Sequence, residues 1–189
     1  SENEIVMKII LETPRLLLRE VDECDVDGFF EMDSDPEVVR YVGVPPTENR
    51  EKSLEIIRFV QSQYVAFGIG RWSVVVKSTG EFAGWCGLKQ MAGQTVNGRT
   101  DFVDIGYRFS RRYWGMGYAT ESAQAALDYG FSVLGFDEIC SFADLRNEAS
   151  QRVLTKIGLQ RGNEFELEGN AHVWFEKHLR RSTQNHTTY

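Results

Sequence analysis

The sequence predicts an α/β protein of the α+β kind, in which a mixed central sheet of about seven strands carries helices on both faces. The chain has 189 residues, of which 42% are hydrophobic, so it is long and apolar enough to form one core. Segments of apolar period two are interspersed with segments of helical period. Their order, strand-helix-helix-strand-strand-strand-helix-strand-helix-strand-strand, differs from the regular alternation of a doubly wound sheet. We expect residues 1–189 to form a single domain, with 1–10 and 178–189 as frayed tails.

The first third of the chain predicts one strand followed by helices. Residues 15–21 alternate between apolar and polar and indicate the first strand. Asp25 is a candidate N-cap for a short helix, and Asp35-Pro36-Glu37 is typical of a second helix start. Beyond Pro45-Pro46, Thr47 is a candidate N-cap for a longer helix that Gly68 would end. The apolar face of this helix would hold Leu54, Ile57, Val60, Tyr64 and Phe67.

The remaining elements follow from changes of period and from turn residues. Residues 72–76 and 82–89, joined by the turn 77–81, predict a hairpin. A polar, glycine-containing loop over 91–100 leads to the next strand. The expected elements after it are a strand at 102–109, a loop at 110–116, a helix at 117–134, a strand at 138–143, a helix from Asn147 to Gly158, and strands at 159–166 and 171–177.

The charge balance disfavours nucleic acid as a partner. The chain has 28 acidic and 21 basic side chains, a net charge of −7, and its Lys and Arg residues are scattered. Binding to duplex nucleic acid requires a basic face. A negative field weakly favours a cationic partner such as an amine.

Membrane, export and metal functions are also disfavoured. No apolar run approaches the ~20 residues of a membrane helix, and the acidic start Ser1-Glu2-Asn3-Glu4 is unlike a secretion signal. Cys24, Cys86 and Cys140 are odd in number and far apart, with no Cys/His cluster. This pattern predicts neither a disulfide framework nor a metal site. We therefore expect a cytoplasmic protein without a membrane partner.

Two glycines open the helix expected at 117–134. The segment Arg112-Tyr-Trp-Gly-Met-Gly-Tyr-Ala-Thr-Glu121 links a strand to this helix, where exposed N–H groups and the helix dipole favour an anion. A P-loop would need Lys and Ser/Thr after Gly117, where Tyr118 and Ala119 stand. A dinucleotide fingerprint would need Gly or Ala in place of Thr120. A plain turn with a glycine-opened helix is the remaining alternative.

Together with its context, this loop resembles the GNAT superfamily of N-acetyltransferases. The segments that carry the resemblance are Asp104-Ile-Gly-Tyr107, Tyr113-Trp-Gly-Met-Gly-Tyr-Ala-Thr-Glu121, Asn147-Glu-Ala-Ser150 and Lys156-Ile-Gly158-Leu159. The opening Leu11-Glu-Thr-Pro-Arg-Leu-Leu-Leu-Arg19 is similar to the ribosomal-protein N-terminal acetyltransferase (RimJ/RimL-like) branch. The resemblance covers about residues 11–177, nearly the whole chain.

The resemblance implies a GNAT fold with acetyl-CoA as cosubstrate. The strands at 102–109 and 138–143, fourth and fifth in order, would splay apart and admit the pantetheine arm, which would pair with the main chain of Tyr107, Arg108 and Phe109. Main-chain N–H groups of the glycine loop would bind the pyrophosphate, and Trp114 stands where the family usually has Gln or Arg. Arg112 and its neighbour Arg111 could add charge toward a phosphate or could be solvated loop charges. The implied loop residues are Trp114, Gly115, Met116, Gly117, Tyr118, Ala119 and Thr120.

Asn147 and Ser150 each have two interpretations. Asn147 is a good N-cap with Ser150 at the third helical position, which requires no further role. By resemblance, Asn147 would contact the pantetheine and Ser150 would lie near the thiol. Amine attack on a thioester forms an oxyanion and expels a thiolate, so a proton donor and a backbone N–H donor are useful there.

The general base is the least determined residue. Asp104 is the first choice, with Glu164, Glu166 and His172 as alternatives, and Ser150 is the second candidate catalytic residue. An α-amino group with a pKa of ~8 is already partly neutral at pH 7, so a water chain could suffice. Glu81 and Glu121 are more typical of a solvated turn and of a helix N-terminus.

Direct transfer of an acetyl group to the N-terminal amine of a protein, such as a ribosomal protein, is the favoured activity. The alternatives are acetylation of a small amine, such as a polyamine or aminoglycoside, and a non-catalytic acyl-CoA-binding sensor or scaffold. Residues 25–67 would form the acceptor groove, and both a monomer and a homodimer remain open. Four aromatic residues could line an acceptor pocket, although such residues are more often core: Tyr41, Phe67, Trp72 and Trp85.

Overall fold

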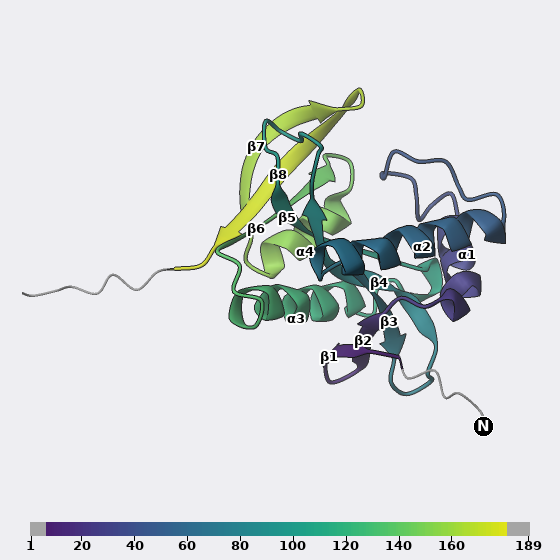
Figure 1. The fold of residues 1–189 in the computed structure, drawn as a ribbon. Helices are drawn as coiled ribbons and strands as arrows, with labels where there is room; N and C mark the ends of the chain where they lie inside the picture. Colours follow the sequence, from purple (N-terminus) through teal and green to yellow (C-terminus); the bar gives the residue numbers. More distant parts are fainter. Residues whose placement is uncertain (1–6, 181–189) are drawn as a thin grey trace, which may run out of the picture.

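The computed structural model describes residues 7–180, which form one eight-stranded sheet with flanking helices (Figure 1). The strand order is β1-β2-β3-β4-β5-β6-β8-β7, and the β5–β6 pair is parallel while its neighbours are antiparallel. The expected mixed sheet is therefore confirmed. The strands are β1 (Ile9–Glu12), β2 (Leu16–Glu20), β3 (Arg71–Val76), β4 (Phe82–Met91), β5 (Phe102–Phe109), β6 (Glu138–Asp144), β7 (Gln160–Leu167) and β8 (Asn170–His178).

The extra strand is β1, which the sequence analysis placed in a frayed tail. It pairs antiparallel with β2, so Ile9 and Ile10 belong to the sheet edge. At the other end, His178 is the last residue of β8 and pairs with Glu138 of β6. Residues 1–6 and 181–189 of the two expected tails lie outside the described residues.

Two pairs of helices cover opposite faces of the sheet, as expected (Figure 1). A small core of Val21, Phe29, Met32, Ile57 and Val60 lies under α1 and α2, and a larger core lies under α3 and α4. Neighbouring side chains of β4 point to opposite faces, so that Trp85 joins the first core and Cys86 the second. The helices are α1 (Val26–Asp33), α2 (Arg50–Phe67), α3 (Tyr118–Ser132) and α4 (Glu148–Lys156), with short 3-10 turns η1 (Glu23–Asp25) and η2 (Arg111–Tyr113).

Asp25 stands at the N-cap position of α1, as expected, but its side chain makes no capping hydrogen bond. Asp22 caps the preceding 3-10 turn by accepting a hydrogen bond from the Cys24 N–H. Asp25 is instead buried, where its carboxylate accepts two hydrogen bonds from Arg19 at 2.6 and 2.8 Å and one from Ser73 at 2.7 Å. A fully bonded charge pair of this kind satisfies a carboxylate that would otherwise be costly to bury.

The segment after α1 also differs from expectation. Asp35-Pro36-Glu37 begins turns and no helix, with the Val38 and Val39 N–H groups donating to the Asp35 carbonyl. The prolines that follow at 45 and 46 prevent these turns from extending. Asn49, and not Thr47, caps α2 by accepting from the Lys52 N–H at 3.0 Å. Gly68 ends α2 in the left-handed conformation as expected, but Phe67 is exposed.

The two central strands separate after a single paired position. The parallel β5–β6 ladder contains only the pair Asp104 and Cys140. Beyond it, the Ser141 hydroxyl donates to the Ile105 carbonyl at 2.8 Å. Peptide groups along a strand alternate in direction, so Tyr107 directs its main-chain N–H and C=O toward β6 as well. The splay implied by the resemblance is therefore present.

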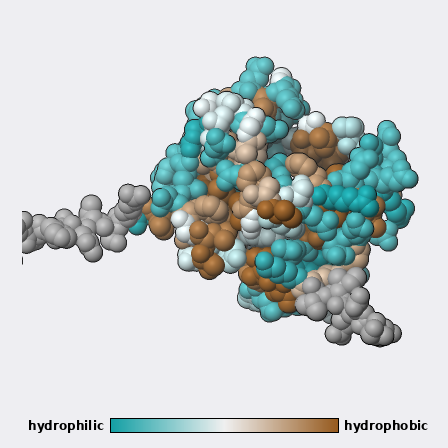
Figure 2. Space-filling view, viewed as in Figure 1, coloured by the Kyte–Doolittle hydropathy of each residue, from teal (hydrophilic) through white to brown (hydrophobic). Residues whose placement is uncertain are grey.

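The surface of the described part of the chain is mixed. Figure 2 shows hydrophilic residues around the β7–β8 turn and around the loop between α1 and α2, with hydrophobic residues in small groups between them. Within residues 7–180, no helix combines the length and the apolar character that crossing a membrane would need.

Candidate active site

A cavity of about 320 Å³ lies where β5 and β6 separate. Its walls are β5, β6, the loop at 40–43, the start of α4 and the β7–β8 turn, which rises opposite the loop in Figure 1. The residues of the sequence analysis that line it are Tyr41, Trp85, Asp104, Tyr107, Arg108, Asn147, Ser150 and His172. The structure therefore brings together groups from five separate segments of the chain.

Several other candidates lie elsewhere. Glu164 and Glu166 are exposed on β7 and are absent from the cavity lining. Glu81 accepts a hydrogen bond from the Tyr113 hydroxyl at 2.9 Å, and Glu121 accepts from Thr13 and Arg15 at 2.6 and 2.7 Å. Trp72 is a core residue packed edge-on against Tyr129. The four glutamates and Trp72 therefore lie outside the cavity.

The glycine loop forms an uncapped start to α3. Gly115 and Gly117 have φ of +75° and +79°, a left-handed conformation that glycine adopts without steric cost. Gly117 is the N-cap of the 15-residue helix and supplies no side chain to bond the first helical N–H groups. A Cβ at Gly115 would meet no atom within 4 Å, so the space beside it is open. Amide hydrogens and the helix dipole therefore converge on an accessible position, which favours an anion.

Side chains around this loop are held by contacts within the chain. Trp114 donates its indole N–H to the Phe109 carbonyl at 2.9 Å, which joins the loop to the end of β5. Met116 and Trp114 are both about half exposed. Arg15, which the sequence analysis did not select, lies over the Tyr118 ring and 3.3 Å from the position of a Cβ on Gly117. The remaining loop residues, Ala119 and Thr120, belong to the first turn of α3.

Arg111 and Arg112 pair with carboxylates of the α1 segment. Arg111 binds Asp35, and this hydrogen bond lowers the pKa of the Asp35 carboxyl. Arg112 binds Glu31 at 2.8 Å and approaches Glu81 at 3.6 Å. Both guanidinium groups are thus engaged on the protein, and a phosphate contact from Arg112 stays a prediction.

Tyr107, Asn147 and Ser150 form a linked group at the start of α4. The Tyr107 hydroxyl donates to the Ser150 carbonyl at 2.9 Å and lies 3.1 Å from the Ser150 hydroxyl. Burial raises the pKa of Tyr107, so its hydroxyl keeps its proton. Asn147 caps α4 by accepting from the Ser150 N–H at 3.1 Å. The group holds hydroxyl donors beside the splayed end of β5.

Asp104 lies at the inner wall of the cavity beside Arg71. Its side chain is almost fully buried and forms an ion pair with the Arg71 guanidinium, which also donates to the Asp104 and Gly87 carbonyls at 3.0 and 2.9 Å. Burial raises the pKa of Asp104, against the opposing charges of Arg71 and Lys89. The carboxylate is thus more basic than a solvated aspartate and can accept a proton.

His172 enters the cavity from β8. Its Nδ1 lies 2.9 Å from the Asn170 carbonyl oxygen. A carbonyl can only accept a hydrogen bond, so Nδ1 carries the proton and the Nε2 lone pair of the neutral ring stays available. His172 is therefore a second group in the cavity able to accept a proton.

Five charged residues of the lining were not predicted from the sequence: Arg40, Arg71, Asp144, Arg146 and Glu168. They come from four separate segments of the chain, and no motif joins them. A single charged residue on a strand or loop is usually solvated, so only the three-dimensional arrangement reveals them.

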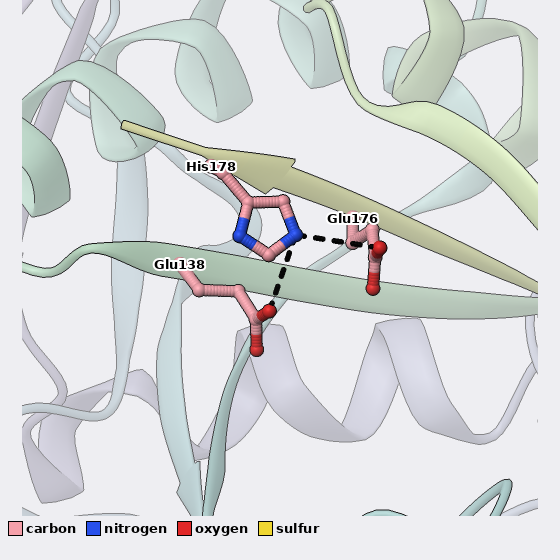
Figure 3. A group of neighbouring side chains, drawn as sticks. All are labelled: Glu138, Glu176 and His178. Atoms are coloured by element: carbon pink, nitrogen blue, oxygen red, sulfur yellow. Dashed lines mark ion pairs between the residues drawn. The ribbon is translucent and has the colours of Figure 1, made fainter. Parts of the chain in front are cut away.

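A separate cluster of potential metal ligands lies at the far end of β6 and β8. Glu138, Glu176 and His178 bring their ligand atoms within 4.8 Å of one another (Figure 3). The His178 Nε2 is 3.3 Å from each carboxylate, and Arg99 also pairs with both glutamates. The sequence analysis expected no metal site. Because Arg99 already supplies a cation, an ion-pair network accounts for this cluster.

Comparison with known proteins identifies the family. Residues 15–160 match the acetyltransferase (GNAT) domain family. YkkB of Bacillus subtilis is 37% identical over 155 residues, which cover 80% of this chain and 86% of YkkB. The chain belongs to the GNAT acetyltransferase family. The N-acetyltransferase YoaA of Bacillus subtilis is 33% identical over 152 residues, covering 80% of this chain and 83% of YoaA.

Solved GNAT structures share the fold. A GNAT-family acetyltransferase from Bacillus anthracis superposes with a TM-score of 0.77 at 23% identity, covering 90% of this chain and 98% of that one. RimL, a ribosomal alpha-N-protein acetyltransferase in complex with coenzyme A, superposes with a TM-score of 0.74 at 15% identity, covering 91% and 98%. The GNAT fold and the activity expected from the resemblance, acetyl-CoA-dependent N-acetylation, are therefore confirmed.

Proposed function

We propose that this GNAT enzyme acetylates the α-amine at the N-terminus of a protein, as a RimJ/RimL-like enzyme does. The observation that carries the proposal is the cavity at the β5–β6 splay, which is bounded by the exposed loop at 40–43 and the exposed β7–β8 turn. A chain end would reach the cavity past these two segments, whose Gly43 and Glu168 lie side by side at the rim. The fold shared with RimL supports this acceptor class.

In this proposal acetyl-CoA spans the gap from the glycine loop to the cavity. Main-chain N–H groups from Trp114 to Thr120 bind the diphosphate at the start of α3. The pantetheine pairs with main-chain groups of Tyr107 to Phe109, and Asn147 contacts it from α4. The thioester then lies beside Tyr107 and Ser150, which are joined by their hydroxyl groups.

The reaction is a direct transfer between bound acetyl-CoA and the amine. The amine nitrogen attacks the thioester carbon, an N–C bond forms, the C–S bond breaks, and the CoA thiolate leaves. The Tyr107 main-chain N–H stabilises the oxyanion, and the Ser150 hydroxyl donates a hydrogen bond to the leaving thiolate. Asp104 receives the proton of the amine, with His172 as the second candidate because its Nε2 is available.

A mass-spectrometric assay tests this function. Acetyl-CoA is incubated with the protein and a set of peptides with free or blocked N-termini, with spermidine and an aminoglycoside in parallel. The proposal predicts an added acetyl group on free N-termini only. Labelling of spermidine or the aminoglycoside with no labelled peptide supports a small-molecule enzyme, and CoA binding without any transfer supports an acyl-CoA sensor.

A further inference from the structure

Four arginines of the cavity are stacked in pairs on two aromatic rings. The guanidinium carbons of Arg40 and Arg146 lie 5.2 and 5.5 Å from the centre of the Tyr41 ring. Those of Arg71 and Arg108 lie 5.1 and 5.2 Å from the Trp85 ring. Stacking of this kind restrains a guanidinium before a ligand arrives, so less freedom is lost on binding.

Three of the four carboxylates that pair with these arginines are buried behind them. The side chains of Asp33, Asp104 and Asp144 are 3, 8 and 3% exposed. By contrast, Arg40 and Arg146 are 60 and 62% exposed. A molecule that enters the cavity therefore meets Arg146 with its counter-charge buried beneath it, whereas the Glu37 partner of Arg40 is 50% exposed.

The ion-pair partners of these arginines decide which guanidinium groups can still bind a ligand. Arg146 uses Nε and Nη2 on Asp144, at 3.0 and 2.7 Å, and donates to Asn170 at 3.3 Å. Arg40 has an exposed partner, Glu37, at 3.7 Å, which is too long for a strong hydrogen bond. Arg108 donates to the buried Asp33 at 2.8 Å. Arg40 and Arg146 are thus the accessible pair at the mouth of the cavity.

The exposed charged side chains of the described lining are two arginines, Arg40 and Arg146, and one glutamate. Glu168 is the exposed carboxylate of the described lining, and it lies beside Gly43 at the rim. His172 is neutral or positive. An acceptor that carries several ammonium groups would therefore meet like charge, whereas an anionic group would gain charge-assisted hydrogen bonds.

We propose that the acceptor carries a carboxylate next to its reacting amine, and that Arg40 and Arg146, held on Tyr41, bind this carboxylate. This inference rests on the proposed acetyltransferase function and names its acceptor class. The carboxylate can belong to an acidic second residue of a peptide or to a free amino acid.

A matched peptide series tests the inference. The peptides differ only at the second residue, which is Asp, Asn or Lys, and free aspartate and spermidine are included. We expect kcat/KM to be about tenfold higher for the Asp peptide than for the Asn peptide, and lowest for the Lys peptide and spermidine. Activity on free aspartate above that on the Asp peptide would assign the carboxylate to an amino acid and not to a chain.

Variants then assign the preference to the two arginines. Arg40→Gln and Arg146→Gln should each raise KM for the Asp peptide several-fold with little change in kcat, and should leave the Asn peptide and the Kd of CoA unchanged. Arg152→Gln, an exposed arginine of α4 that is absent from the cavity lining, is the control. Since Arg40 has no buried partner, its variant keeps the test informative if Arg146→Gln fails to fold.

Two results overturn the inference without touching the proposed function. These are equal kcat/KM on the Asp and Asn peptides, and an Asp preference that both arginine variants retain. CoA binding without acetylation of any carboxylate-bearing acceptor also overturns it. A protein that fails to bind CoA would instead contradict the proposed function.

Discussion

Replacing Gly117 by glutamate tests the anion site at the start of α3. Gly117 has φ of +79°, where an L-residue costs about 1–2 kcal/mol of folding stability. The new carboxylate would extend into the space in which the first amides of α3 are exposed. Loss of even one hydrogen bond to a charged phosphate costs about 1.5–3 kcal/mol. We therefore expect the Kd of CoA to rise at least ~30-fold, the equivalent of about 2 kcal/mol.

A matched variant separates this effect from backbone strain. Gly135 lies after the other end of α3, has φ of +73°, and has no atom within 4 Å of a Cβ. Gly135→Glu should lower the melting temperature by a similar few degrees, since it imposes the same strain. Isothermal titration calorimetry with CoA and thermal unfolding are measured on both variants. The reasoning is refuted if Gly117→Glu binds CoA like the unmodified protein, or if Gly135→Glu loses as much affinity.

Three further predictions follow from the same contacts. Asn147→Ala should cost about 1 kcal/mol of stability through the lost cap, and should also weaken acetyl-CoA binding modestly; a melting shift with unchanged affinity would leave Asn147 as a cap alone. Asp104→Asn should lower kcat about a hundredfold or more, and His172→Gln should lower it much less. Because burial raises the pKa of Asp104, kcat/KM of the unmodified enzyme should fall as acid protonates this residue. The reverse ranking of the two variants in steady-state assays would make His172 the base. Acidification below pH ~4 should reduce the free energy of unfolding measured in urea. Hydrogen bonds from Arg111 and Arg146 lower the pKa of Asp35 and Asp144 in the folded chain, so the unfolded chain binds more protons. Constant stability from pH 6 to 3 would contradict these pairings.

The strands and long helices were predictable because their periods and end signals are local. The β3–β4 hairpin, α3 and the left-handed Gly68 that ends α2 all follow from spacing and turn residues. The errors lie where tertiary contacts override local signals. Asp25 has the residue type of an N-cap, but Arg19 and Ser73 bind it in the interior. Asp35-Pro36-Glu37 has a helix-start pattern, yet Arg111 binds Asp35 and the segment stays in turns.

The glycine loop and the cavity also differ in how far the sequence alone predicts them. The glycine loop lies on one continuous segment, so its sequence pattern was enough to propose it as an anion site. The cavity residues come from separate segments, and the stacking of Arg40 and Arg146 on Tyr41 depends on the fold bringing residue 41 beside residue 146. No spacing within the chain encodes that contact. Burial of Asp144 behind Arg146 likewise becomes visible only in three dimensions.

A crystal structure of the protein with coenzyme A and an acidic acceptor peptide tests the central claim most directly. The account predicts diphosphate density within hydrogen-bond distance of the main-chain N–H groups between Trp114 and Thr120, with the pantetheine between β5 and β6. Density for the diphosphate at any other surface, or a glycine loop closed by its own side chains, would contradict it.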